Sequence, residues 1–162
     1  MQILSKIKQP FWILVFLVGC CAMLLLISQL WFSYHLNKTP SLPHAFFAVH
    51  KASQPVIGEY AAIEWKGGGG YQQGDVFIKI LGGVSGDTIE VRNRSVLING
   101  QKLAEAKSHS LADAPLQIIA AGTIPAGQVF VYTPHKDSFD SRYQMFGLVD
   151  EQQIIGKAYG FF

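Results

Sequence analysis

An almost unbroken apolar run over residues 11–32 constrains this chain most, because it is long enough to cross a lipid bilayer as one helix. About 20 residues suffice to span the hydrocarbon core in that form. Trp12 lies near one end of the run, and Trp31 and Tyr34 lie near the other, where interfacial aromatic residues are expected. The sequence therefore predicts a transmembrane anchor over residues 11–32.

The charges that flank this run predict the direction in which it crosses the membrane. Lys6 and Lys8 precede the run, and no acidic residue does. Positively charged flanks favour the cytoplasmic side of a membrane. We therefore expect residues 1–10 in the cytoplasm and residues 37–162 on the opposite side.

Both cysteines of the chain, Cys20 and Cys21, lie inside the apolar run, so residues 37–162 contain no disulfide. Leu17–Cys20 is similar to a lipobox, where a bacterial lipoprotein is cleaved and lipidated, and it follows a basic segment as a secretory signal would. The run stays apolar from Ala22 to Leu30, which favours an uncleaved anchor. Lipidation at Cys20 is the alternative, and either arrangement tethers the following domain to the membrane.

The charge balance of residues 37–162 excludes one class of partner. Of the 13 lysines and arginines only Lys6 and Lys8 precede this segment, and all 11 acidic residues lie within it, so the segment is formally neutral. A nucleic-acid-binding domain would carry a basic patch. The five histidines show no metal-ligand spacing. We expect neither nucleic acid, nor a metal, nor another cofactor.

Short apolar segments separated by glycine and proline turns dominate the sequence beyond residue 37. They predict β-strands at residues 46–49, 60–65, 75–81, 88–92, 95–98, 128–132 and 153–159. Residues 101–117 are polar and rich in alanine, which predicts a loop or a short helix. The pattern indicates a small, mostly antiparallel β domain, open or partly barrel-like, after one N-terminal transmembrane helix.

Lys79 lies within one of these predicted strands and has apolar neighbours on both faces. Phe77 and Leu81 share its face, and Ile78 and Ile80 share the other. Burial disfavours the charged ammonium and can lower the pKa of a lysine by up to ~3–5 units. A neutral amine near pH 7 can act as a general base or a nucleophile. The alternative is an edge-strand lysine that opposes aggregation.

Ser41, between Pro40 and Pro43, could supply a hydroxyl for such an amine, although a serine between prolines is also an ordinary turn residue. At most ~30 Å of extended chain separates it from the end of the apolar run. A nucleophile there could meet membrane-inserted substrates. A desolvated lysine and a serine on the outer face of a membrane together indicate a Ser/Lys peptidase.

A Ser-His-Asp triad is the rival chemistry. Its nucleophile would be Ser85 in Gly83–Asp87, where Asp87 occupies the position two residues after the serine. This segment lacks the second glycine of a nucleophile elbow, and no helical pattern follows it. The sequence therefore favours the Ser/Lys pair.

Three segments of the chain, in the same order, resemble signal peptidase I, and more closely its TraF-type branch of conjugative-transfer peptidases. Residues 37–47 resemble the nucleophile box, with a Ser-Leu-Pro run typical of that branch. Residues 74–91 resemble the lysine-base box. Residues 137–143, followed by 155–158, resemble the C-terminal box. The resemblance spans nearly the whole domain beyond the anchor.

The resemblance implies a role for each matching residue. Ser41 would be the nucleophile that forms the acyl-enzyme, and Lys79 would be its general base. Ser138 would hydrogen-bond the lysine amine and orient it. The backbone N–H of Ser41 and the hydroxyl of Thr39 would stabilise the oxyanion.

The C-terminal box carries a further implied contact and one of the departures from the family pattern. Asp140 and Arg142 would form a structural ion pair that holds the box near the dyad. Tyr132-Thr133-Pro134 replaces the usual Gly-Asp-Asn run, and Ile80 replaces the arginine that usually follows the base. These departures bear on substrate fit more than on the dyad.

The resemblance also implies a function and a location. The chain would be a single-pass protein of the bacterial inner membrane with a periplasmic catalytic domain. It would cleave signal or leader peptides from membrane-inserted preproteins, with a conjugative pilin precursor as the expected client. Capture of the acyl-enzyme by a peptide amine would yield a cyclic pilin. The alternative is a catalytically silent, membrane-anchored scaffold of pilus or type IV secretion assembly.

Overall fold

The computed structural model describes the backbone of residues 3–162 and the side chains of residues 11–162. Helix α1 (Ile3–Trp31) contains a 21-residue segment, Phe11–Trp31, with a mean hydropathy of 2.7 and no buried residues. By length and composition this segment is sufficient to cross a membrane. Lys6 and Lys8 lie outside the residues whose side chains are described, so the orientation stays a prediction.

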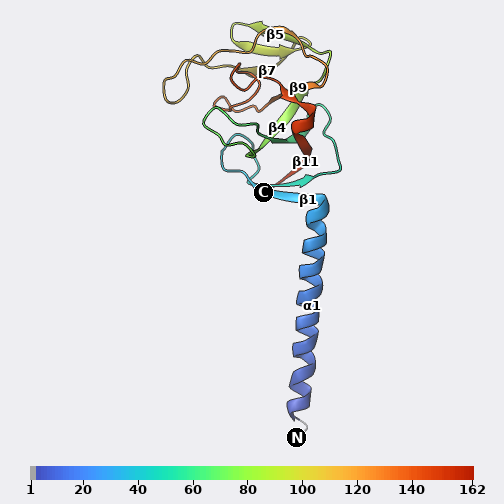
Figure 1. The fold of residues 1–162 in the computed structure, drawn as a ribbon. Coiled ribbons are helices and arrows are strands. Elements are labelled where there is room, and N and C mark those ends of the chain that lie inside the picture. Colours follow the sequence, from blue (N-terminus) through green and yellow to red (C-terminus); the bar gives the residue numbers. More distant parts are fainter. Residues whose placement is uncertain (1–2) are drawn as a thin grey trace. The chain divides into compact units, whose positions relative to one another are not determined.

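The described residues that follow α1 form two sheets (Figure 1). The larger sheet has the strand order β1 (Phe32–Leu36), β2 (Phe46–His50), β11 (Ile154–Phe161), β3 (Tyr60–Glu64), β4 (Val76–Gly83), β9 (Gln128–Tyr132) and β10 (Val149–Asp150). The smaller sheet has the order β7 (Gln101–Glu105), β6 (Ser95–Ile98), β5 (Thr88–Arg92) and β8 (Gly122–Thr123). A 3-10 turn, η1 (Glu151–Gln153), precedes β11. The predicted mostly β fold with one N-terminal apolar helix is confirmed.

The loop or short helix predicted for residues 101–117 is wrong at its start, where β7 forms instead. Asn99 and Gly100 have φ angles of 49° and 80°, the left-handed conformation of a two-residue hairpin turn. This turn folds the chain back so that Gln101 pairs with Ile98. Turn geometry therefore overrides the polar composition of this short strand. The sequence also gave no signal for the short strands β1, β8 and β10.

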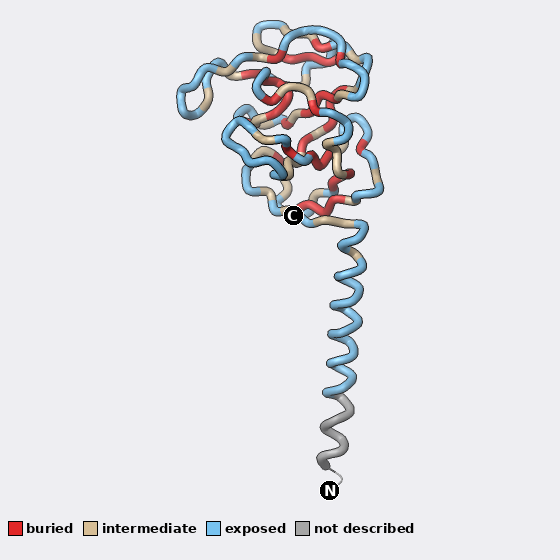
Figure 2. Tube along the Cα trace, viewed as in Figure 1, coloured by how far each residue is buried: buried red, intermediate tan, exposed pale blue. Residues whose placement is uncertain are grey.

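Among the residues whose burial is described, the buried ones all lie in the part of the chain after α1 (Figure 2). Strand β4 separates two groups of these buried apolar side chains, and this arrangement determines the surroundings of Lys79. Phe77 and Leu81 pack on one face with the first cluster, which consists of Ala61, Ile63, Trp65, Leu81, Val129, Val131, Phe146 and Val149. Ile78 and Ile80 pack on the other face with the second cluster, which consists of Leu42, Phe47, Val49, Ala62 and Ala158. Because side chains alternate along a strand, Lys79 lies on the face of the first cluster.

Candidate active site

Lys79 is buried in the interior of the larger sheet, with only 5% of its surface exposed. Its strand, β4, lies between β3 and β9, so the edge-strand interpretation is wrong. The Lys79 amine donates a hydrogen bond of 2.9 Å to the Ser138 hydroxyl. The ring centroid of Phe77 lies 5.7 Å from the amine nitrogen.

This environment changes the protonation equilibrium of the lysine. Burial lowers the pKa of the Lys79 amine from 10.5 to about 8, while the Asp140 carboxylate raises the pKa and the Arg142 guanidinium lowers it. The two charges act in opposite directions, so desolvation dominates the shift. Roughly a tenth of an amine with this pKa is uncharged at pH 7, and the neutral form can accept a proton.

Ser138 is held opposite the lysine by the packing of its neighbour in sequence. Ser138 is itself buried and lies in the loop between β9 and β10. The ring of Phe139 contacts Trp65 at a centroid distance of 5.6 Å and Phe146 at 5.0 Å. The Ser138 N–H donates to the carbonyl of His135 at 3.2 Å. The loop that presents the Ser138 hydroxyl is thus fixed from both sides.

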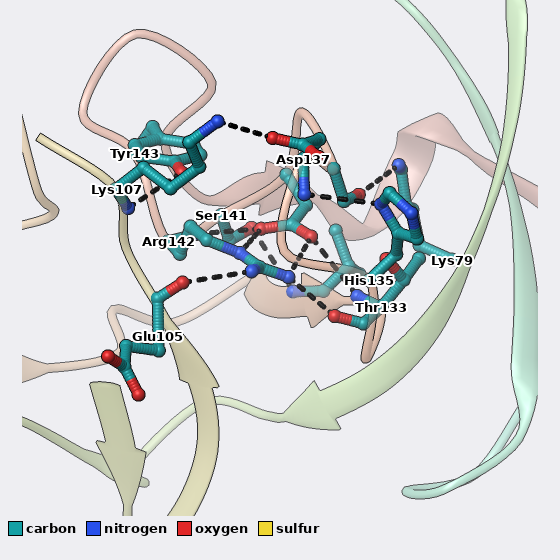
Figure 3. Close-up of polar contacts among 12 residues, drawn as sticks. Lys79, Glu105, Lys107, Thr133, His135, Asp137, Ser141, Arg142 and Tyr143 are labelled. Atoms are coloured by element: carbon teal, nitrogen blue, oxygen red, sulfur yellow. Dashed lines mark hydrogen bonds and ion pairs between the residues drawn. The ribbon is translucent and has the colours of Figure 1, made fainter. Parts of the chain in front are cut away.

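Asp140 and Arg142 form a buried ion pair at the base of the same loop (Figure 3). The Arg142 guanidinium donates to both carboxylate oxygens of Asp140, at 2.7 and 2.8 Å. It also donates to the backbone carbonyls of Thr133 and Glu105. The Thr133 N–H donates to the Asp140 carboxylate at 3.1 Å. The pair therefore ties the end of β9 and the end of β7 to the segment that follows Ser138.

Ser41 lies in a loop before β2 that Asn37 organises. The Asn37 amide nitrogen donates to the carbonyls of Leu42 at 3.2 Å and of His44 at 2.9 Å. Its amide oxygen accepts from the Thr39 N–H at 3.3 Å. The Leu42 side chain is buried in the second cluster, and burial of a leucine contributes roughly 1.5–3 kcal/mol. The loop around the Ser41 hydroxyl is thereby held on the sheet.

Of the residues that the motifs singled out, four form two separate hydrogen-bonded pairs in the structure, Ser41 with Thr39 and Lys79 with Ser138. The hydroxyls of Ser41 and Thr39 are 3.0 Å apart and share a hydrogen bond. Lys79 is bonded to Ser138. Among the described residues, no hydrogen bond connects Ser41 with Lys79. Catalytic hydrogen bonds are often long before substrate binds and tighten only in its complex.

The two histidines near these loops have structural contacts. His135 Nδ1 accepts a hydrogen bond from the Asp137 N–H at 3.2 Å. The His44 ring packs edge-on against Phe47 and Tyr60 at centroid distances of 5.7 and 5.8 Å. Neither histidine has a described hydrogen bond to Ser41. Within residues 11–162, no three His, Cys, Asp or Glu side chains are arranged to hold a metal ion.

Two parts of the site do not follow from the motifs. The first is the set of hydrogen bonds from Asn37 to the backbone, which could have been expected because asparagine commonly hydrogen-bonds the backbone of a turn. The other is a hairpin of residues 107–116, which lines a cavity together with Ser138. Its polar, alanine-rich sequence has neither strand nor helix periodicity. Nothing in that sequence indicates that the hairpin lies beside Ser138.

Comparisons with known proteins match most of the chain. The family model of signal peptidases, peptidase S26, matches residues 10–162. The probable signal peptidase I-1 of Synechocystis sp. is 34% identical over 89 residues, which are 55% of this chain and 43% of the relative. Signal peptidase IB of Staphylococcus aureus is 31% identical over 99 residues, 51% of each.

The chain spans about half the length of these curated relatives. A crystal structure of a signal peptidase I from Enterococcus faecalis is 25% identical in sequence. That match covers 65% of this chain and 97% of the other, with a TM-score of 0.40.

Proposed function

The chain belongs to the signal peptidase family, peptidase S26, and on this premise we propose that it is a membrane-anchored serine endopeptidase with Ser41 as nucleophile and Lys79 as general base. One observation carries the proposal. Lys79 is a buried amine with a pKa of about 8, held 2.9 Å from the Ser138 hydroxyl. A lysine of this kind can accept a proton near neutral pH, which an exposed lysine does not.

The proposed reaction uses this amine twice. Neutral Lys79 removes the proton of the Ser41 hydroxyl as the oxygen attacks the scissile carbonyl carbon. The resulting oxyanion is stabilised by the Ser41 N–H and the Thr39 hydroxyl. The Lys79 ammonium then gives its proton to the leaving amine, and the peptide bond breaks to leave an acyl-enzyme. Lys79 then deprotonates a water whose oxygen attacks the ester carbonyl. As the bond to the Ser41 oxygen breaks, the Lys79 ammonium returns the proton to that oxygen, and the acyl group leaves as a carboxylic acid.

The proposed substrates are membrane-inserted preproteins whose signal or leader peptides are removed. The apolar segment Phe11–Trp31 supports anchoring in the bacterial inner membrane, with residues 37–162 on the periplasmic side. The Ser-Leu-Pro form of the nucleophile box supports the TraF-type branch and a conjugative pilin precursor as client. An amine of the bound pilin could replace water in the second step and give a cyclic product.

Removal of the nucleophile tests the proposal. In cells that express the chain with a candidate two-span prepilin, Ser41→Ala should leave the precursor unprocessed. Ser85→Ala is the matched control, because Ser85 is exposed and belongs to the rival Gly-Val-Ser-Gly-Asp segment. The Ser85→Ala variant should process the precursor normally. Normal processing by Ser41→Ala would contradict the proposal, and unprocessed precursor with normal pilus assembly would favour a scaffold.

The hydroxyl of Thr39 should contribute to the rate without being essential. Its oxygen lies 3.0 Å from Ser41 Oγ, beside the atom that attacks. Loss of one oxyanion donor typically costs about 10²–10³ in rate. We expect Thr39→Val to lower kcat for precursor cleavage by about 10²-fold, whereas Thr39→Ser should retain most of it. Equal kcat values for the valine and serine variants would exclude a role for this hydroxyl.

A further inference from the structure

Ser138, which accepts the hydrogen bond from Lys79, lines a cavity of about 310 Å³. This volume is near the lower end of the range of about 300–1,000 Å³ that is typical of ligand sites. Its lining includes Ser138 and Phe139, together with Leu111, Ala112 and Leu116 of hairpin 107–116. The cavity could hold one or two side chains of a peptide.

Hairpin 107–116 is attached to the domain at its base. The Arg94 guanidinium donates to the backbone carbonyl of Lys107 and, at 3.0 Å, to that of Leu116, so it joins the two ends of the hairpin. The Lys107 N–H donates to the Tyr143 hydroxyl at 3.1 Å (Figure 3). The Lys107 amine pairs with the Asp137 carboxylate at 2.5 Å. These contacts hold the wall of the cavity against the C-terminal box.

The tip of the hairpin presents apolar surface to solvent. Leu111 lines the cavity and is 86% exposed, and Ala112 beside it is also exposed. Lys107 and Asp137 line the cavity and are paired with each other. The lining also includes His109, whose Nδ1 lies 3.1 Å from the Ser108 hydroxyl. An apolar side chain that entered would bury the leucine surface, whereas a carboxylate would lose its hydration beside a lysine that is already paired with Asp137.

The chemistry of the proposed reaction decides which part of a substrate passes this cavity. Ser138 both lines the cavity and binds the Lys79 amine, while Ser41 and Thr39 do not line it. The acyl half of the substrate stays attached to the Ser41 oxygen. The leaving amine must come to the Lys79 ammonium to receive its proton. The half of the substrate that leaves is therefore the half that runs past Ser138.

We propose that this cavity is a subsite for an apolar side chain among the first three residues on the leaving side of the scissile bond. The proposal rests on the proposed peptidase function and extends it to the part of the precursor that becomes the mature protein. Leu111, Ala112 and Leu116 are the apolar residues that hairpin 107–116 contributes to its lining.

Cleavage of matched peptides by the full-length chain in detergent tests this subsite. The probes are synthetic preprotein peptides with one cleavage site that differ only in carrying leucine or aspartate at the first, second or third leaving-side position. The wild-type chain should prefer leucine at one of these positions by about 10-fold or more in kcat/KM, because small differences in apolar burial give about 10–200-fold discrimination. Ala112→Trp, which fills the cavity, should reduce that ratio to near 1.

Ala114→Trp is the matched control. Ala114 is exposed in the same hairpin, and its N–H, like that of Ala112, donates to Ser110 Oγ at 3.2 Å, but it does not line the cavity. It should keep the wild-type leucine-to-aspartate ratio, a within-variant comparison that does not depend on the amount of folded protein. Cleavage by the wild type without a leucine preference would contradict the subsite but not the peptidase function. Equal leucine-to-aspartate ratios in Ala112→Trp and Ala114→Trp would do the same. Absence of cleavage and of Ser41 acylation in the wild type would overturn both.

Discussion

Lys79→Met should abolish precursor cleavage, with a loss of about 10⁴-fold or more in kcat, while the protein stays folded. Methionine fills a similar volume on β4 but can neither accept the Ser41 proton nor donate to the leaving amine. Single losses from a catalytic unit that acts together commonly cost about 10⁴–10⁶ in kcat. Cleavage of a membrane-inserted precursor in reconstituted vesicles measures the effect. Lys66→Met, at an exposed position after β3, is the control and should cleave normally.

The stability of the Lys79→Met variant should separate catalysis from folding. Because the native pKa of Lys79, about 8, is below the unfolded value of 10.5, the unfolded state binds more protons between these two values. The cost of burying the ammonium is therefore fully present below pH 8 and is relieved as the pH rises to 10.5. It amounts to roughly 3 kcal/mol, against about 1 kcal/mol for the lost hydrogen bond to Ser138. At pH 7 the variant should unfold no more easily than wild type, and substantial cleavage by a folded Lys79→Met variant would contradict the proposed base.

Arg142→Ala should be the most destabilising of the single changes considered, at about 3–5 kcal/mol. The change leaves the Asp140 carboxylate buried without its partner, and breaking one side of a buried ion pair typically costs that much. It also frees the carbonyls of Thr133 and Glu105, which accept from the same guanidinium. Denaturant unfolding of the detergent-solubilised chain would measure the loss.

A surface pair provides the comparison for Arg142. Arg92 pairs with Glu90 on β5, where the arginine side chain is 68% exposed. Arg92→Ala should change the free energy of unfolding by at most about 1 kcal/mol, as is usual for exposed pairs. Arg142→Lys, which keeps the charge but loses the two-pronged contact, should fall between the two. Similar effects for Arg92→Ala and Arg142→Ala would show that the buried pair does not hold the C-terminal box.

The same ion pair should also influence the lysine. Asp140 raises the pKa of Lys79 and Arg142 lowers it, so removal of Arg142 leaves the raising effect unopposed. Arg142→Lys retains the opposing charge. In this variant the pH profile of precursor cleavage should stay close to that of the wild type. The pair therefore has two consequences, one for the loop that carries Ser138 and one for the proton affinity of Lys79.

The strands that could be predicted from the sequence have a clear apolar pattern. Strand β4 is an example, since Phe77 and Leu81 pack on one face and Ile78 and Ile80 on the other. The same neighbours indicated that Lys79 is buried. Strand β7 lacks such a pattern, because only Ala104 of its five residues is buried. It forms because the preceding turn and pairing with β6 determine its conformation.

The candidate site likewise has a part that local sequence motifs predict and a part that they do not. Short motifs predict its residues, and their catalytic roles stay predictions. The structure shows the hydrogen bond from Lys79 to Ser138 and the ion pair between Asp140 and Arg142. The cavity beside Ser138 depends on contacts between segments far apart in the sequence. Arg94 reaches the hairpin across 22 positions at Leu116, and Lys107 reaches Asp137 across 30. No local pattern encodes such long-range contacts, so only the folded structure reveals the cavity.

The pH dependence of acylation at Ser41 tests the central claim most directly. The full-length chain in detergent would be treated with a serine-acylating probe from pH 6 to 11, and the adduct on the Ser41 peptide would be followed by mass spectrometry. We predict that labelling at Ser41 rises about tenfold per pH unit, levels off near the Lys79 pKa of about 8, and is absent in Lys79→Met. Labelling that does not depend on Lys79, or that levels off only near 10.5, would contradict the claim that a buried lysine activates this serine.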